Sequence, residues 1–371
     1  MRRPNDVHAA TLARLSRLVA IRSLSRAEGE LADALAADLA QAGLRVQRSG
    51  ANLWCEIGDA PRPRLLLNSH LDTVPAGEGW TGDPWTPRLV DGRLIGLGAN
   101  DAKGCVTAMI EAALSIQREL RSGETLGGTL VLALTAEEEI SGNGLATILD
   151  SLKPLDAAIV GEPTNLIPMI AQRGLLILKG IARGRSAHPA NTPPGSADNA
   201  IMTAAEDLLK LRDFNWGPPH PLLGKCHAHV TMINGGIARN VIPDSCEFFL
   251  DIRTTPLQPH RHAYERLKRF LCSELHIHSE RLVPVETSPE ASIVKAVLSA
   301  LPGYEPAGSP TMSDMVFLAG IPAVKIGPGE SPRSHTPDEF VTFKELENGA
   351  QTYRRIISEY FALAGRGGHL P

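Results

Sequence analysis

The sequence predicts an α/β fold, in which a mostly parallel, helix-covered sheet receives an inserted, smaller ferredoxin-like α+β domain. Strands and helices alternate along the first half of the chain, and strands such as 64–70 and 128–135 contain continuous apolar runs. Such strands are typical of parallel sheets that are covered on both faces. Residues 174–285 instead follow the order strand-helix-strand-strand-helix-strand of a ferredoxin-like unit. The length of 371 residues also favours two domains, because single cores rarely exceed roughly 250–300 residues.

Hydrophobic periodicity and turn residues give the elements in chain order. Before the insertion, we expect helices at 7–20, 27–43 and 102–121, and strands at 44–50, 52–58, 64–70 and 128–135. We also expect an Asp91-Gly92 hairpin turn, a short helix after residue 144, and a strand followed by a loop within 155–164. Within it, we expect strands at 174–184, 225–235, 245–255 and 278–287 and helices at 196–213 and 262–275. After it, a helix at 291–301, a strand within 320–329 and a helix at 343–363 complete the first domain. The predicted domains are therefore 1–173 with 286–371, and 174–285.

Composition excludes several classes of protein. The net charge of −4 and the lack of a basic stripe argue against nucleic acid as a partner. Five scattered cysteines without a CxxC pair indicate reduced thiols, and we expect a cytoplasmic protein. The first 23 residues fit an amphipathic helix better than a signal peptide, and no apolar run approaches the ~18 residues of a membrane span.

Histidines and carboxylates gather at the ends of predicted strands, where ligands bind in open α/β sheets. They are His70, Asp72, Asp101, Glu137, Glu138, Glu139, Glu162 and His335. Each alone has an ordinary explanation, such as a core histidine, a helix N-cap or a solvated glutamate run. Together, two histidines and three carboxylates suit divalent ions such as zinc or cobalt, and a pair of ions needs a bridging carboxylate. Asp72 is then available to orient His70, and one glutamate of the triplet to act as a general base.

Six segments resemble the dinuclear-zinc aminoacylase and carboxypeptidase superfamily. They are "NSHLDTV", "GLGANDAKG", "TAEEEISG", "VGEPT", "GRSAHPA" and "RSHTPDEF", and the resemblance runs from about residue 10 to residue 360. "INGGIARNVIPD", "SPTMSDMVFLAG" and "VKIGPGESPRSHT" favour the branch of acetylornithine deacetylases and succinyl-diaminopimelate desuccinylases. Ala102 stands where relatives often have methionine, which leaves Asp101 in place.

The resemblance implies a role for each matching residue. His70, Asp101 and Glu162 would hold one zinc, and Asp101, Glu139 and His335 the other, with Asp101 as the bridge. Glu138 matches the general base, and Asp72 the residue behind His70. His188 matches a histidine that reaches the partner's site across a homodimer, and Asn240 and Arg253 match positions that contact substrate. Residues 1–173 and 286–371 would bind metal and catalyse, and residues 174–285 would form a dimerisation and lid domain.

The implied activity is metal-dependent removal of the acyl group from an N-acyl amino acid, with N-acetylornithine of arginine biosynthesis as the leading substrate. The expected cofactors are two zinc ions per chain, which cobalt can replace. N-acetylcitrulline, N-succinylornithine, succinyl-diaminopimelate and dipeptides remain alternative substrates. A dimeric binding protein without catalysis is the alternative from another class, and the presence of Glu138 with all five ligands argues against it. No GxGxxG follows a strand, so a dinucleotide site is not expected.

Overall fold

The structure is a computed structural model that describes residues 4–140, 142, 144–193 and 195–366. The chain divides into two compact units. The first runs to Ile170 and resumes at Thr287–Ala307 and from Ser313 onwards, and the second comprises Ala171–Glu286 with Gly308–Met312. Within the described residues, the helices are all too short or too polar to cross a membrane.

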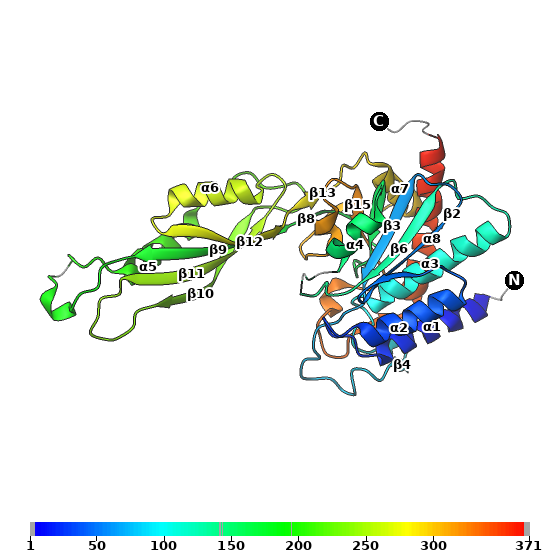
Figure 1. The fold of residues 1–371 in the computed structure, drawn as a ribbon, viewed down its shortest axis with the longest axis horizontal. Coiled ribbons are helices and arrows are strands. Elements are labelled where there is room, and N and C mark those ends of the chain that lie inside the picture. Colours follow the sequence, from blue (N-terminus) through cyan, green and yellow to red (C-terminus); the bar gives the residue numbers. More distant parts are fainter. Residues whose placement is uncertain (1–3, 141, 143, 194, 367–371) are drawn as a thin grey trace. The chain divides into compact units, whose positions relative to one another are not determined.

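The first unit is built on a sheet whose four central strands are parallel (Figure 1). The order β6-β3-β7-β15 has only parallel pairs, while β2 joins β6 and β1 joins β2 in antiparallel fashion. The bounds are β1 Gln47–Ser49, β2 Asn52–Gly58, β3 Arg64–His70, β6 Thr129–Thr135, β7 Ala157–Val160 and β15 Ala323–Lys325. At the other side of β15 lies β8 (Met169–Gln172), which pairs with it through Met169. The apolar runs of β3 and β6 are buried on both faces, as the sequence predicts.

Helices cover both faces of this sheet. On one face, α3 (Lys103–Arg121) packs on β2, β3 and β6, and α1 (Pro4–Ala20) and α8 (Phe343–Arg366) pack on α3. Ser69 points toward α3, whereas its neighbour Asn68 bonds to the 3₁₀ helix η3 (Asp314–Leu318). Because successive strand residues point to opposite faces, η3 and α3 lie on opposite sides of β3. The remaining helices of this unit are α2 Gly29–Gln41, α4 Leu145–Leu152 and α7 Ser292–Ala300.

A second, three-stranded sheet follows the order β16-β5-β4. Its strands are β4 Arg88–Val90, β5 Arg93–Ile95 and β16 Phe340–Thr342. The turn between β4 and β5 is the expected Asp91-Gly92 pair, and both residues have positive φ, 47° and 72°. This sheet connects residues just before α3 with the loop that carries His335.

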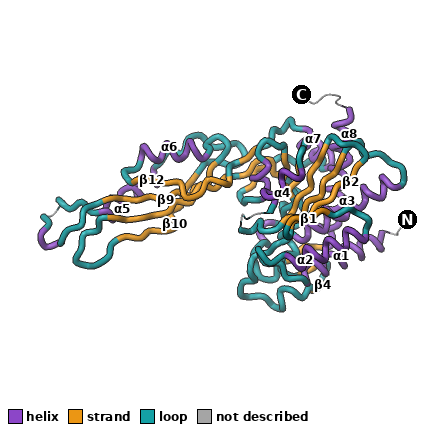
Figure 2. The backbone as a smooth tube through the Cα atoms, in the orientation of Figure 1, coloured by secondary structure: helices purple, strands orange, loops and turns teal. Residues whose placement is uncertain are grey.

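The second unit has the element order β9-α5-β10-β11-α6-β12, and Figure 2 shows its strands and helices. Its four strands are all antiparallel in the order β10-β11-β9-β12, which is the ferredoxin-like arrangement. The bounds are β9 Gly174–Arg183, α5 Ala200–Lys210, β10 His227–Gly235, β11 Ser245–Thr254, α6 His260–Phe270 and β12 Glu274–Leu282. The short strands β13 Val285–Glu286 and β14 Ala307–Ser309 both pair with β8 in the larger sheet. Together the two units confirm the predicted fold class.

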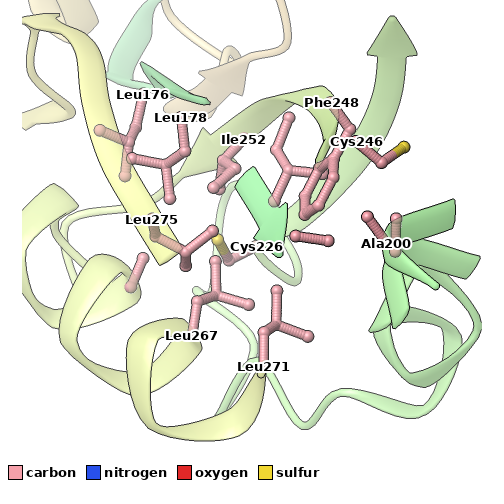
Figure 3. Close-up of a cluster of buried hydrophobic side chains, with 14 residues drawn as sticks. Leu176, Leu178, Ala200, Cys226, Cys246, Phe248, Ile252, Leu267, Leu271 and Leu275 are labelled. Atoms are coloured by element: carbon pink, nitrogen blue, oxygen red, sulfur yellow. The ribbon is translucent and has the colours of Figure 1, made fainter. Parts of the chain in front are cut away.

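The core of the second unit lies between its sheet and its two helices (Figure 3). Alternate residues of β11, such as Phe248, Leu250 and Ile252, face Leu267 of α6 and its neighbours. The ring of Phe248 fills the space above Gly180, where an added Cβ would come within 2.2 Å of it. The alternation of buried and half-exposed residues in β9 and β11 therefore follows from one covered face.

The predicted helix at 262–275 differs from the structure. Helix α6 ends at Phe270, and β12 already begins at Glu274. The cause is Asp207 of α5, whose carboxylate accepts hydrogen bonds from the main-chain N–H groups of Cys272 and Ser273. This distant side chain takes over the backbone donors at the point where a local pattern would continue the helix.

Candidate metal centre

Three parallel strands end side by side and carry the predicted ligands to one edge of the sheet. In the register of β3 and β6, His70 lies opposite Thr135, so Glu138 and Glu139 follow directly beyond it. In the register of β3 and β7, Asn68 lies opposite Val160, so Glu162 also extends past the strand end. The carboxyl ends of parallel strands thus place all four side chains at the same edge.

Asp101 lies between the two histidines. Its Oδ1 is 3.2 Å from Nε2 of His70, and its Oδ2 is 3.7 Å from Nε2 of His335. Glu139 contacts His335 at 3.1 Å, and Glu162 lies 4.0 Å from Nε2 of His70. The five residues predicted to bind metal are therefore brought together, with Asp101 in the position of a bridge.

Glu138 and Glu139 both point into this cluster, but toward different partners. Glu138 groups with His70 and Glu162, and Glu139 groups with His70 and Asp101, each with ligand atoms within 4.8 Å of one another. Only Glu139 is in hydrogen-bond contact with His335 among the described residues. This contact favours Glu139 as the ligand beside His335 and leaves Glu138 on the His70 side.

Asp72 has a broader role than the sequence indicates. Nδ1 of His70 lies 3.0 Å from the main-chain oxygen of Asp72 and 3.4 Å from its Oδ1, so the closer partner is the carbonyl. The carboxylate itself accepts hydrogen bonds from the main-chain N–H of Glu138 at 3.0 Å and of Glu139 at 3.1 Å. It also accepts one from the hydroxyl of Ser25 at 2.7 Å. Asp72 therefore holds the glutamate turn as well as the imidazole.

Two backbone conformations at the centre are unusual for residues with side chains. Glu137 has φ of 57° and His335 has φ of 60°, both in the left-handed region. Such strain is retained where neighbouring contacts hold it. The N–H of Glu137 donates to the buried carboxylate of Glu28 at 3.0 Å, which holds the first residue of the turn.

The electrostatics of the centre fit bound cations. Burial and neighbouring carboxylates raise the pKa of Glu162 to about 8 and that of Glu138 well above its usual value. The hydrogen bond to Glu139 raises the pKa of His335 to about 9. The buried carboxylates outnumber the positive groups near them, which include Lys325, and such an excess is costly unless cations neutralise it. Imidazole nitrogens and carboxylate oxygens are the donor set for divalent ions such as zinc.

The other three predicted residues lie in the second unit. His188 is exposed, and its Nδ1 accepts a hydrogen bond from the N–H of Ala190, which leaves Nε2 directed elsewhere. An isolated bridge between Ala187 and Ile242 brings this loop near the exposed Asn240. Arg253 is instead paired with Asp251 at the far end of β11, roughly 30 Å away in an extended strand. Within one chain, His188 and Asn240 are near each other and Arg253 is separate.

Three buried carboxylates near the centre escape the sequence reasoning: Glu28, Asp314 and Glu339. Asp314 accepts a hydrogen bond from Thr135 at 2.9 Å, and burial raises its pKa to about 6. Asp314 and Glu339 occur inside segments that carry the family resemblance, "SPTMSDMVFLAG" and "RSHTPDEF". From sequence alone, a single acid in a loop is expected to be solvated. The partners that bury these acids are remote in sequence, so no local pattern reveals them.

Known proteins resemble this chain over most of its length. The acetylornithine deacetylase of Proteus mirabilis is 32% identical over 340 residues, covering 81% of this chain and 80% of that protein. The N-acetyl-L-citrulline deacetylase of Xanthomonas campestris is 27% identical, covering 95% and 99%. The crystal structure of aminopeptidase PepT from Bacillus cereus has the same fold, with a TM-score of 0.76, 20% identity and coverage of 95% and 98%.

The family model described as Peptidase family M20/M25/M40 matches residues 66–359, which is more than half of the chain. The predictions of this superfamily and of a metal-dependent amide hydrolase are thereby confirmed. The chain belongs to peptidase family M20/M25/M40.

Proposed function

We propose that the protein is a dinuclear zinc deacylase that hydrolyses the amide of N-acetylornithine. The observation that carries this proposal is the convergence of two histidines and three carboxylates, with Asp101 between the imidazoles. The similarity to acetylornithine deacetylases over most of the chain supports the substrate. This reaction belongs to arginine biosynthesis, and we infer a cytoplasmic location from it.

The proposed ligands follow the contacts at the centre. His70, Asp101 and Glu162 would hold one zinc, and Asp101, Glu139 and His335 would hold the other. When bound, zinc lowers the pKa of water toward ~7 and polarises the amide carbonyl. Cobalt accepts the same ligands, so it is expected to replace zinc.

The side chains of the chain itself then handle the protons. Glu138 removes a proton from the attacking water and transfers it to the nitrogen of the departing amine. Burial and the neighbouring Glu162 hold the pKa of Glu138 well above its usual value, so its carboxylate takes up a proton more readily than that of an ordinary glutamate. The carboxylate of Asp72 keeps Glu138 in place by accepting a hydrogen bond from the main-chain N–H of Glu138. The products are the free carboxylate of the acyl group and the free amine of the amino acid.

We further propose that the protein is a homodimer in which His188 serves the partner's centre. The edge strand β10 pairs only with β11 among the described residues, and its Val230, Met232 and Ile233 are exposed by 42%, 64% and 54%. An exposed apolar edge strand is a template for pairing with another chain, and a two-fold homodimer would cover it. His188 then donates a hydrogen bond to the carbonyl oxygen as it gains negative charge, a contribution of about 3–4 kcal/mol. Asn240 and Arg253 are proposed to contact the substrate.

N-acetylcitrulline is the second candidate substrate, because one relative is an N-acetyl-L-citrulline deacetylase. The test is to compare N-acetylornithine, N-acetylcitrulline, N-succinylornithine and a dipeptide as substrates of zinc- and cobalt-loaded protein. The proposal expects the largest kcat/KM for N-acetylornithine. Preference for N-acetylcitrulline would select the second candidate, and cleavage of the dipeptide alone would reject both.

A further inference from the structure

Glu339 presents a buried carboxylate to the turn that carries Asp101. Its side chain is only 2% exposed and comes from the loop between His335 and β16. Its Oε1 accepts hydrogen bonds from the main-chain N–H groups of Asn100 at 2.9 Å and Asp101 at 2.8 Å. Its Oε2 accepts one from Gly98 at 3.1 Å. A single carboxylate thus satisfies three backbone donors of one turn.

The turn held in this way sets the position of the bridging carboxylate. Asp101 reaches both imidazoles, 3.2 Å from His70 and 3.7 Å from His335. A small rotation of the Asp101 backbone would lengthen at least one of these contacts. The main-chain bond from Asp101 to Glu339 is therefore directly coupled to the geometry of both proposed metal positions.

The same residue connects this turn with the loop of His335. The main-chain oxygen of Glu339 accepts a hydrogen bond from the N–H of Gly96 at 2.9 Å, and the next residue, Phe340, pairs with Ile95. The side chain of Asn100 adds contacts to Glu330 and to Ser334, which precedes His335. The two segments that supply ligands to the second metal position are thus locked to each other.

A carboxylate is the group that this position requires. Both of its oxygens only accept hydrogen bonds, whereas an amide of the same shape has one accepting oxygen and one donating nitrogen. Glutamine at position 339 would therefore direct an N–H donor at a main-chain N–H donor.

We propose that Glu339 is a positioning residue that fixes Asp101 between the two metal ions and so determines metal affinity. The inference rests on the proposed metal centre. It predicts that Glu339→Gln weakens metal binding by about 10–100-fold, the range found when partners of metal ligands are removed. Hydrolysis falls as a consequence.

Asp59 offers a control in the same unit, with the same pattern of hydrogen bonds at an exposed position. Its carboxylate also accepts hydrogen bonds from three main-chain N–H groups, those of Leu126, Gly127 and Gly128. These lie before the start of β6, about 23 Å along the strand from its metal-proximal end. Asp59→Asn should therefore lower stability without changing the metal centre.

The experiment titrates metal-free wild type, Glu339→Gln and Asp59→Asn with cobalt(II), followed by visible absorption, and with zinc in competition with a chelator. Thermal unfolding of the metal-free proteins measures the structural cost separately. The expected result is weaker binding and an altered cobalt spectrum for Glu339→Gln only. Wild-type affinity and spectrum in Glu339→Gln, or equal losses in both variants, would overturn the inference.

A fallback variant and the wild-type titration keep the inference testable. If Glu339→Gln does not fold, Glu339→Asp replaces it, because aspartate keeps the two accepting oxygens but shortens their reach. Weaker cobalt binding by Glu339→Asp then supports the inference, and wild-type affinity refutes it. A wild-type protein that binds neither ion would refute the proposed metal centre itself, which is distinct from a failure confined to position 339.

Discussion

Replacing Glu138 by glutamine separates proton transfer from metal binding. The substitution keeps the shape of the side chain and leaves the main-chain N–H of residue 138 bonded to Asp72. It removes only the ability to take up a proton, in a carboxyl group whose pKa burial and Glu162 hold well above the usual value. Loss of a positioned general base costs roughly 10²–10⁴ in rate. At about 1.4 kcal/mol per factor of ten, this is about 3–5 kcal/mol of transition-state stabilisation.

The assay measures kcat on N-acetylornithine together with the metal content of the purified variant. Glu139→Gln is the matched comparison, because Glu139 rather than Glu138 contacts His335. We expect Glu138→Gln to keep its metal and lose turnover, and Glu139→Gln to lose metal. If Glu138→Gln loses metal while Glu139→Gln keeps it, the two roles are exchanged. Undiminished turnover of Glu138→Gln would refute the reasoning.

Three further predictions concern the second unit. The pKa of Asp207 lies below its usual value because main-chain and hydroxyl donors of Cys272 and Ser273 stabilise the carboxylate, although burial opposes them. The contribution of Asp207 to the free energy of unfolding is therefore complete above the unfolded pKa of about 3.9 and is lost as pH falls through the folded pKa. Asp207→Asn should lower the free energy of unfolding by denaturant by about 1–3 kcal/mol at pH 7, and the difference from wild type should vanish in acid. Met232→Glu should shift a dimer toward monomer in sedimentation, and an unchanged dimer would place the interface elsewhere. Mixing Glu138→Gln with His188→Ala under verified subunit exchange should restore activity, and no recovery would mean that His188 does not act across a dimer.

The strand ends were the predictable part of the site. Histidines or acids at the carboxyl ends of several parallel strands are expected to meet at one edge of the sheet. His70, Glu139 and Glu162 do so in the observed strand register. Residue spacing does not show which glutamate of the triplet is the base and which is the ligand. Adjacent glutamates are chemically identical and differ only in the direction that the turn gives their side chains. That direction depends on Asp72 and Glu28, which hold the main-chain N–H groups of the turn.

Contacts between remote residues were the unpredictable part. Glu339 bonds to amides about 240 positions earlier, and Asp207 ends a helix more than 60 positions later. Local periodicity carries no trace of either contact, so it predicts a helix at 262–275 that extends too far and assigns no role to Glu339. The expected role of His188 comes from the family resemblance, because residue spacing alone gives no reason to single out this histidine.

The most direct test of the account is metal content measured together with hydrolysis of N-acetylornithine. The protein is stripped with a chelator, and zinc or cobalt is returned in measured amounts while the amine product is quantified. The account predicts no turnover without metal and recovery of activity as binding approaches two ions per chain. Full activity in rigorously metal-free protein, or no deacylation after two ions are bound, would contradict it.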